Sequence, residues 1–261
     1  MFKFIFNLFG ENVWNNGFVF KNGQEYNNSY LILMFGLIFA IIVVAYFLGS
    51  INSAVIFSKL IYKEDIRTKG SGNAGMTNMM RTYGKGPAAL TLLCDMLKTL
   101  VAMAIGTCLY GITGAYIAGL FAVVGHVLPI YYGFKGGKGV ASSAMIILYL
   151  DAIVFLIILL LFVLIVWATK YLSLGSIISI LIFPLMMNRM DTALTGRGIR
   201  LIITLVVAAI VVFKHRTNIV RIMNGTESRF SFKKTQKKPT ATVEELEEND
   251  DDETEEDSEE N

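Results

Sequence analysis

The sequence predicts an all-α integral membrane protein with about seven transmembrane helices. Hydrophobic residues make up 54% of the 261-residue chain and charged residues 17%, and the mean hydropathy is +0.56. This composition is too apolar for an ordinary soluble domain. The apolar residues also gather in long runs, separated by short loops that carry lysine, arginine and glycine. Such runs are typical of membrane-spanning helices.

Seven apolar runs set the predicted number of spans. They cover residues 31–48, with an extension toward 61, and residues 87–110, 112–132, 139–150, 152–168, 172–187 and 199–213. Several of them are shorter than the roughly 20 residues that cross a bilayer. The division at Asp151 has an alternative, because residues 139–168 also suit one long tilted helix. That choice decides whether the two ends of the chain lie on the same side of the membrane.

The loop lysines and arginines predict the orientation. With seven spans, the basic loops after the first, third, fifth and seventh runs all lie on one side of the membrane. The positive-inside rule makes that side the cytoplasm, with the N-terminus outside and the C-terminus cytoplasmic. Arg189, Arg197 and Arg200 lie on the opposite side and count against this topology.

Charge and composition divide the chain into three parts. Residues 1–30 are predicted to be an N-terminal interfacial extension, residues 31–230 the membrane domain, and residues 231–261 a disordered cytoplasmic tail, first basic and then acidic. The net charge of +2 conceals this division, because 13 of the 21 acidic residues lie between Glu244 and Glu260. The remaining chain has 23 basic and 8 acidic residues, which suits anionic lipids or anionic substrates.

The first segment with candidate chemistry runs from Gly70 to Arg81. It matches the G-x-G-x-x-G pattern of dinucleotide sites. In such a site a buried strand precedes the glycines, whereas the residues before Gly70 are polar and charged. A glycine-rich turn with hydroxyls, amides and a guanidinium can instead bind phosphate. The alternative is a flexible polar loop. The polar and glycine residues of this candidate site are Gly70, Ser71, Gly72, Asn73, Thr77, Asn78 and Arg81.

The second segment, residues 125–139, sets two lysines among glycines between two apolar runs. Lys135, Gly136, Gly137 and Lys138 suit an anion site, because glycines let backbone N–H groups approach a phosphate and lysines add charge. The segment is not a Walker A loop, since Gly139 stands where that motif needs serine or threonine. The alternative is that the lysines only anchor the loop at the cytoplasmic surface.

A third segment follows the last apolar run. If it is helical, His215, Asn218 and Arg221 share one face and present a ring, an amide and a cation to one ligand. Within the spans, Asp95 and Lys98 are expected to pair or to face a polar cavity, because ionisable groups at that depth are costly. They form either a structural pair or a contact to substrate, and Lys98 is counted among the candidate substrate-binding residues. At the start of the sixth run, the hydroxyls of Ser173 and Ser176 either cap a helix or reach a ligand.

Metal and thiol chemistry are not expected. The chain has two histidines, His126 and His215, which are far apart and lack a carboxylate motif, so no metal site and no cofactor are predicted. Cys94 and Cys108 are 14 positions apart in one apolar run, roughly 21 Å along a helix, too far for a disulfide. Neither has the neighbours of an activated thiol.

Together these segments resemble the bacterial acyl-phosphate:glycerol-3-phosphate acyltransferases, over residues 46–227. The resemblance rests on several ordered motifs: residues 49–51, 70–81, Asp95 with Lys98, 125–126, 134–141, 171–176 and 215–227. Asn52, Ala74 and Met76 depart from the family's usual residues, and both termini are longer than the family core. None of these differences removes a polar group assigned to the chemistry.

The resemblance implies a seven-span enzyme of the bacterial cell membrane, with its active site facing the cytoplasm. Ser71 and Arg81 match its essential serine and arginine, and residues 136–138 match its glycerol-3-phosphate loop. Ser176, His215 and Asn218 match further substrate contacts, so that Ser71, Arg81, His215 and Asn218 are the expected catalytic residues. Glu227 matches a glutamate of structural importance.

The implied reaction transfers an acyl group from acyl phosphate to the sn-1 hydroxyl of glycerol-3-phosphate and makes lysophosphatidic acid. We expect direct attack without an acyl-enzyme, because no Gly-x-Ser-x-Gly elbow or activated cysteine is present. The base is either His215 or, as the resemblance favours, a phosphate oxygen of the substrate. The expected partners are the two substrates and membrane lipid, with no nucleic acid. The alternative function is a membrane carrier or channel for an organic or phosphate anion; a phosphatase would need metal-binding carboxylates or more histidines.

Overall fold

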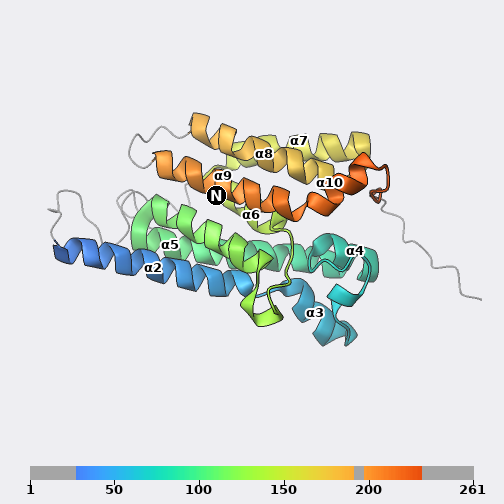
Figure 1. Cartoon of the computed structure of the whole chain (residues 1–261), viewed down its shortest axis with the longest axis horizontal. Helices are drawn as coiled ribbons and strands as arrows, with labels where there is room; N and C mark the ends of the chain where they lie inside the picture. The colour runs from blue at the N-terminus through green and yellow to red at the C-terminus, as the bar shows by residue number, and fades with distance from the viewer. Residues whose placement is uncertain (1–27, 191–196, 231–261) are drawn as a thin grey trace, which may run out of the picture. The chain divides into compact units, whose positions relative to one another are not determined.

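The computed structural model describes residues 28–190 and 197–230, and its regular secondary structure in these ranges is entirely helical (Figure 1). The long helices are α2 (Asn28–Ser50), α5 (Lys85–Val127), α7 (Ala152–Thr169), α8 (Leu172–Met190) and α9 (Arg197–Lys214), and the shorter ones are α3 (Ser53–Tyr62), α4 (Met76–Tyr83), α6 (Val140–Leu150) and α10 (Arg216–Met223). Two 3-10 turns, η1 (Ile66–Thr68) and η2 (Ile130–Tyr132), lie in the loops. Nearly all of the predicted N-terminal extension, and the whole predicted tail, lie outside the described residues.

Two polar residues divide the apolar runs. The side chain of Asp151 accepts hydrogen bonds from the N–H groups of Ile153 and Val154, at 2.8 and 3.0 Å, and so begins α7. Residues 139–168 therefore form two helices and not one. Asn52 caps α3 in the same way, so the extension of the first run toward residue 61 is a separate helix.

Helix α5 is a hairpin of two helices. Tyr110 and Gly111 have non-helical backbone angles, and the φ of +57° at Gly111 is favourable only for glycine. Gly106 and Gly114, four residues before and three after this break, lie against each other. The two halves therefore run antiparallel, as the separate apolar runs 87–110 and 112–132 predict, and Figure 1 shows them side by side.

The described helices include segments that are long and apolar enough to cross a membrane. Residues 31–62, 85–132 and 152–169 meet that test, and α9 with α10 gives a fourth if the pair, bent by 55°, is one span. α6 and residues 172–187 of α8 are apolar but shorter. Large apolar side chains such as Phe39, Leu160 and Trp167 are exposed along these helices, which is typical of a surface that faces lipid.

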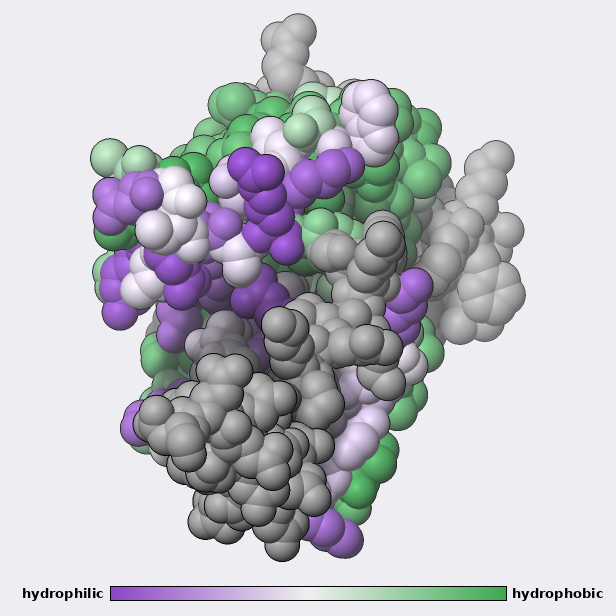
Figure 2. Space-filling model, turned by 90° about the vertical axis from the view of Figure 1, so that its right-hand side faces the viewer, coloured by the Kyte–Doolittle hydropathy of each residue, from purple (hydrophilic) through white to green (hydrophobic). Residues whose placement is uncertain are grey.

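The helices pack around a core formed by α5 to α9. Its buried side chains include Met103, Val123, Phe183 and Val207. α2 packs against α5, where Gly49 approaches the backbone of Ala122. The short helices α3, α4 and α10 lie at one end of this bundle (Figure 1). Figure 2 looks at that end and shows hydrophilic side chains gathered there, with hydrophobic ones along the receding sides.

Candidate functional site

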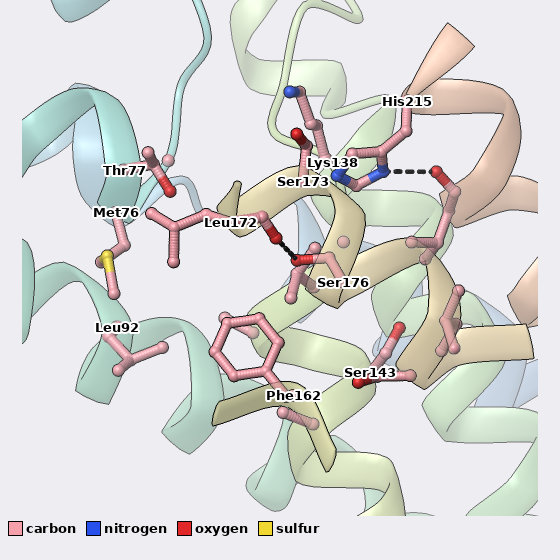
Figure 3. Close-up of a pocket in the computed structure, with 18 of the residues that line it drawn as sticks. Met76, Thr77, Leu92, Lys138, Ser143, Phe162, Leu172, Ser173, Ser176 and His215 are labelled. Carbon is pink, nitrogen blue, oxygen red and sulfur yellow. Dashed lines mark hydrogen bonds between the residues drawn. The ribbon is translucent and has the colours of Figure 1, made fainter. Parts of the chain in front are cut away.

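A cavity of about 330 Å³ opens beside α4, α10 and the loops next to them, and extends between the apolar helices. Its polar lining comprises Ser71, Asn73, Thr77, Asn78, Arg81, Asp95, His126, Lys138, Ser143, Ser173, Ser176, Ser179, His215, Asn218, Arg221 and Glu227. Its apolar lining includes Met76, Leu92, Met96, Ile147, Phe155, Ile158, Leu159, Phe162 and Ile180. Figure 3 shows residues of both kinds around one space. The cavity therefore suits a ligand with a polar head and an apolar chain.

The first polar segment is held in shape by the amide of Asn78. Its Oδ1 accepts a hydrogen bond from the Ser71 N–H at 2.9 Å, and its Nδ2 donates to the carbonyls of Ile66 and Lys69, both at 3.0 Å. Asn78 is buried, whereas Ser71 is exposed at the cavity. The polar atoms of Asn78 thus support the turn that carries Ser71.

The lysine–glycine loop packs directly on His126. The Gly137 N–H donates to the His126 carbonyl at 3.1 Å, and a Cβ at Gly137 would collide with the His126 ring and lie 2.8 Å from the Ala74 carbonyl. Only glycine fits this close approach. The loop then directs Lys138 into the cavity, where its Nζ donates to the Asn218 Oδ1 at 2.6 Å. Lys135 is exposed and does not line the cavity.

Burial gives Lys138 an unusual acidity. Loss of water contact lowers the pKa of its ammonium from 10.5 to about 8, although the nearby Glu227 acts in the opposite direction. The positive charges of Arg221, Arg81 and Lys214 lower the pKa further. Such a concentration of positive charge at the mouth of a cavity favours an anion.

Glu227 joins the elements around the mouth. Its Oε1 accepts hydrogen bonds from Ser173 at 2.6 Å and from the Asn218 amide at 2.7 Å, and its Oε2 accepts from the Arg221 Nε at 2.9 Å. Burial alone would raise the pKa of this carboxyl, but the three hydrogen bonds outweigh burial and lower it. The Ser173 hydroxyl therefore helps to hold Glu227 in place and does not cap α8.

The segment that follows α10 borders the mouth, where Glu227 lines the cavity. The Arg81 Nη2 donates to the Ser228 Oγ at 2.7 Å, and the Phe230 N–H donates to the Lys170 carbonyl at 2.7 Å. Together with Glu227, these contacts connect α4, the start of α8 and α10 through residues 227–230. The segment after α10 is thus part of the site.

His215 presents one ring nitrogen to the cavity. Its Nδ1 lies 2.8 Å from the Val211 carbonyl, which only accepts, so Nδ1 carries the proton and donates (Figure 3). In the neutral ring, Nε2 is then an acceptor. The residue is 2% exposed and lines the cavity. α10 is helical, as expected, and Asn218 and Arg221 on its one face both bind Glu227.

Asp95 and Lys98 pair with each other, which is one of the two arrangements expected from the sequence. Their atoms Oδ1 and Nζ are 2.8 Å apart, and the Lys98 Nζ is also 3.0 Å from the His126 Nδ1. Ser53 donates to the same Asp95 oxygen at 3.1 Å. Asp95 and His126 line the cavity, whereas Lys98 does not. Lys98 thus lies behind His126, which carries the lysine–glycine loop.

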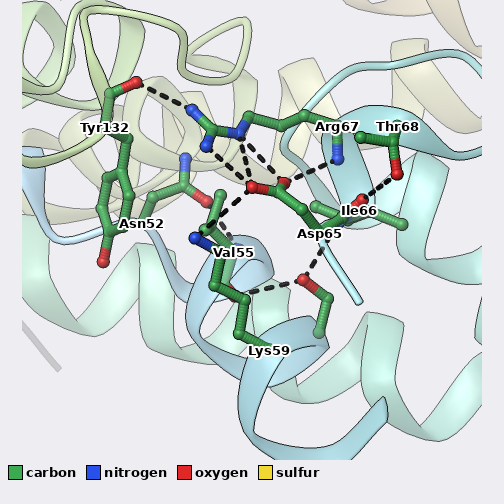
Figure 4. A network of polar contacts seen from close by, with 9 residues as sticks. Asn52, Val55, Lys59, Asp65, Ile66, Arg67, Thr68 and Tyr132 are labelled. Atoms are coloured by element: carbon green, nitrogen blue, oxygen red, sulfur yellow. Dashed lines mark hydrogen bonds and ion pairs between the residues drawn. The ribbon is translucent and has the colours of Figure 1, made fainter. Parts of the chain in front are cut away.

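A second network ties the two candidate loops together outside the cavity (Figure 4). Arg67 forms a two-pronged contact with Asp65, with Nη2 at 2.7 Å and Nε at 3.0 Å, while its Nη1 donates to the Tyr132 carbonyl at 2.7 Å. The hydrogen bond from Arg67 lowers the pKa of Asp65 to about 2, against the effect of burial. Lys59 lies 3.5 Å from the same carboxylate. Arg67 therefore fixes the loop before Gly70 to the loop before Lys135.

We expect Arg67→Ala to lower the free energy of unfolding by about 1–3 kcal/mol, because a charge-assisted contact is lost and the Tyr132 carbonyl loses its donor. Arg67→Lys should lose less stability, because lysine keeps the positive charge, but it should not match the wild type, because lysine cannot form the two-pronged contact with Asp65. Thermal unfolding of the purified protein in detergent measures both. Lys59→Ala is the control, because its exposed ion pair is worth less than about 1 kcal/mol. Equal effects of Lys59→Ala and Arg67→Ala would contradict this role for Arg67.

The structure brings together most of the predicted site residues. The cavity is lined by Ser71, Asn73, Thr77, Asn78, Arg81, Lys138, Ser176, His215, Asn218 and Glu227, and is not lined by Gly70, Gly72, Lys98, Lys135, Gly136 and Gly137. Ser143 and Ser179 also line the cavity, and they were not predicted from the sequence. The sequence holds one signal that could have indicated Ser179, namely its spacing of three residues after Ser176. In the described ranges, no group of three histidine, cysteine, aspartate or glutamate side chains is placed to hold a metal ion.

A family model and several related proteins of known sequence indicate the same family for this chain. The family model described as "Glycerol-3-phosphate acyltransferase" matches residues 39–225. A glycerol-3-phosphate acyltransferase of Finegoldia magna is 42% identical over 190 residues, covering 72% of this chain and 93% of that protein. One from Syntrophomonas wolfei is 43% identical over 194 residues, covering 74% and 97%.

Solved structures agree with this result. The chain is similar to crystal structures of PlsY (YgiH), an integral membrane glycerol 3-phosphate acyltransferase. The glycerol 3-phosphate form has a TM-score of 0.69 at 33% identity, over 74% of this chain and 96% of that one. The lysophosphatidic acid form has a TM-score of 0.66 at 32% identity, over 75% and 96%. The chain therefore belongs to the glycerol-3-phosphate acyltransferase family and is an integral membrane protein.

Proposed function

We propose that this protein transfers an acyl group from an acyl phosphate to the sn-1 hydroxyl of glycerol-3-phosphate, at a site that faces the cytoplasm. The observation that carries the proposal is one cavity with a cationic mouth and an apolar interior. The mouth suits two phosphate groups and the interior suits an acyl chain. The solved relatives, crystallised in glycerol 3-phosphate and lysophosphatidic acid forms, support the acceptor and the product. Family membership favours this enzyme over the anion carrier.

In this proposal the cations at the mouth bind and position the phosphates. Arg81 and Lys138 neutralise phosphate charge, and the hydroxyls of Ser71 and Ser176 provide further polar contacts. Asn218 orients the Lys138 ammonium through the 2.6 Å hydrogen bond. Glu227 is structural, because it holds Asn218 and Arg221 in place. Asn78 supports the turn of Ser71.

The proposed reaction has one acyl-transfer step. The glycerol hydroxyl oxygen attacks the carbonyl carbon of the mixed anhydride, the bond from that carbon to the phosphate oxygen breaks, and inorganic phosphate leaves. The hydroxyl proton passes to a phosphate oxygen, while His215 accepts a hydrogen bond at Nε2 and positions the acceptor. Cys94 and Cys108 do not line the cavity, and no serine hydroxyl of the described residues is hydrogen-bonded to His215, which supports direct attack without an acyl-enzyme.

We further propose seven spans, with the N-terminus outside and the mouth of the cavity in the cytoplasm. α2, the two halves of α5, and α6 to α9 supply seven helices, and the basic loops around the cavity support the orientation. The membrane domain then covers residues 31–230, between the N-terminal extension and the tail.

The test is an assay of the purified protein with glycerol-3-phosphate and palmitoyl phosphate, following both phosphate and lysophosphatidate. We expect equal amounts of the two products. Without glycerol-3-phosphate, direct attack predicts no rapid release of phosphate, whereas an acyl-enzyme would release one equivalent per active site. Turnover with palmitoyl-coenzyme A but not with palmitoyl phosphate would overturn the proposed donor.

We expect kcat/KM for glycerol-3-phosphate to fall as the pH rises above about 8. Lys138 is charged below its pKa of about 8 and neutral above it, so by pH 9 only about a tenth of the free enzyme keeps this cation. The substrate phosphate stays dianionic throughout this range, because its second pKa is about 6. In the Lys138→Arg variant, kcat/KM should not fall in this pH range, because arginine remains charged. Identical pH profiles for the two proteins would rule out Lys138 as the titrating group.

A further inference from the structure

Two buried hydroxyls of the cavity have no hydrogen-bond partner in the described part of the chain. They belong to Ser143, which is 2% exposed, and Ser179, which is 8% exposed. Both line the cavity. A buried hydroxyl without a partner is costly, so its presence in a cavity indicates a ligand atom that completes it.

The two hydroxyls belong to α6 and α8, two helices that begin close to Lys138 and Ser173 of the mouth. Ser143 is the fourth residue of α6 and follows Lys138 by five residues. On α8, Ser173, Ser176 and Ser179 are spaced by three and lead from the mouth into the bundle. Ser173 donates to Glu227 and Ser176 to the Leu172 carbonyl, whereas Ser179 donates to nothing described. In the view of Figure 3, Ser176 lies between Lys138 and Ser143.

Below these hydroxyls the lining is apolar. Ile147 lies one turn after Ser143 on α6, and Ile180 follows Ser179 on α8, while Phe162 and Ile158 come from α7. A ligand that fills the cavity therefore changes from polar to apolar at this level. In an acyl phosphate bound at the mouth, the group at that boundary is the carbonyl, which is next to the phosphate and offers an acceptor.

We propose that the Ser143 and Ser179 hydroxyls donate hydrogen bonds to the carbonyl oxygen of the acyl donor and act as its oxyanion site. The inference rests on the proposed function. When the glycerol oxygen attacks, a carbon–oxygen bond forms and the π electrons of the carbonyl move onto its oxygen. They return as the bond to the phosphate oxygen breaks, and phosphate leaves with that electron pair. Donors fixed at the carbonyl oxygen stabilise the charge that this oxygen carries while the new bond forms and the bond to phosphate breaks.

The chain offers a matched control next to Ser143. Ser142 is also buried and without a partner among the described residues, yet it does not line the cavity. We expect Ser143→Ala and Ser179→Ala each to lower kcat with palmitoyl phosphate about 10- to 100-fold, while KM for glycerol-3-phosphate stays within about twofold. Ser142→Ala should match the wild type. Equal kcat values for all three variants and the wild type would overturn the proposal.

Binding of two non-reacting probes tests carbonyl recognition apart from turnover. Hexadecanoyl phosphonate has the carbonyl, and hexadecyl phosphate lacks it. Ser143→Ala and Ser179→Ala should weaken inhibition by the first probe about 10-fold and leave inhibition by the second unchanged, which also shows that the pocket is folded. Equal loss for both probes would indicate a packing role and overturn the inference. If neither probe inhibits the wild type and palmitoyl phosphate is not used, the proposed function itself fails.

Discussion

Lys138→Ala is expected to lower kcat/KM for glycerol-3-phosphate by about 100-fold or more, which corresponds to about 2.7 kcal/mol of lost transition-state stabilisation. The ammonium is partly buried at the mouth, where a charge interaction is stronger than in water. Its removal also leaves the Asn218 Oδ1 without its donor. Steady-state rates at saturating palmitoyl phosphate, with glycerol-3-phosphate varied, measure the effect.

Lys135→Ala is the matched control for this variant. Both lysines belong to the same loop and removal of either changes the net charge equally, but Lys135 is exposed and does not line the cavity. Its kcat/KM should therefore stay within about threefold of the wild type. Similar losses in the two variants would mean that the loop attracts the substrate only through general charge. They would then contradict a direct contact with Lys138.

Glu227→Ala is expected to lower the free energy of unfolding by about 3 kcal/mol and to abolish most of the activity. Three donors, from Ser173, Asn218 and Arg221, lose a common acceptor, and two of them are buried. Arg221 would also lose the partner of its guanidinium. Thermal unfolding in detergent, followed beside the acyl-transfer rate, measures both effects.

Two comparisons make this prediction specific. Glu64→Ala removes an exposed carboxylate that pairs with Lys69 at 3.1 Å, and it should cost less than about 1 kcal/mol. In the wild type, the pKa of Glu227 is lowered from 4.5, so its contribution to stability is present above that pH and is lost as the pH falls through the folded value. The Glu227→Gln variant should therefore lose less stability than the wild type when the pH is lowered. Equal losses in the two proteins would argue against Glu227 as the source of this pH dependence.

The sequence predicted the broad architecture because lipid imposes strict rules on it. Apolar runs and glycine breaks mark helices and their ends, and the break at Gly111 and the cap at Asp151 lie where the runs divide. Most polar residues of the cavity were also predictable, because charged and amide groups are rare in so apolar a chain. Arg81, Lys138, and His215 with Asn218 come from three segments whose proximity only the family motifs indicated.

The remaining site residues depend on side-chain direction, which spacing alone does not give. Gly136 and Gly137 support the loop from outside the cavity, and Lys98 pairs behind His126. Ser143 and Ser179 escaped prediction for another reason. A serine in an apolar helix usually bonds its own backbone, as Ser176 does, so only the structure reveals that these two hydroxyls are unpaired.

The contacts that residues 227–230 make beside the mouth have a consequence for the synthesis of the protein. Synthesis proceeds from the N-terminus, so Arg81, Lys170 and Ser173 are made before the residues of this segment that bind them. The earlier helices thus pack around an opening that already holds Arg81 and Lys138 but not yet the carboxylate of Glu227. A polypeptide that ends before Glu227 would then be inserted without the acceptor that holds Asn218 and Arg221 in place.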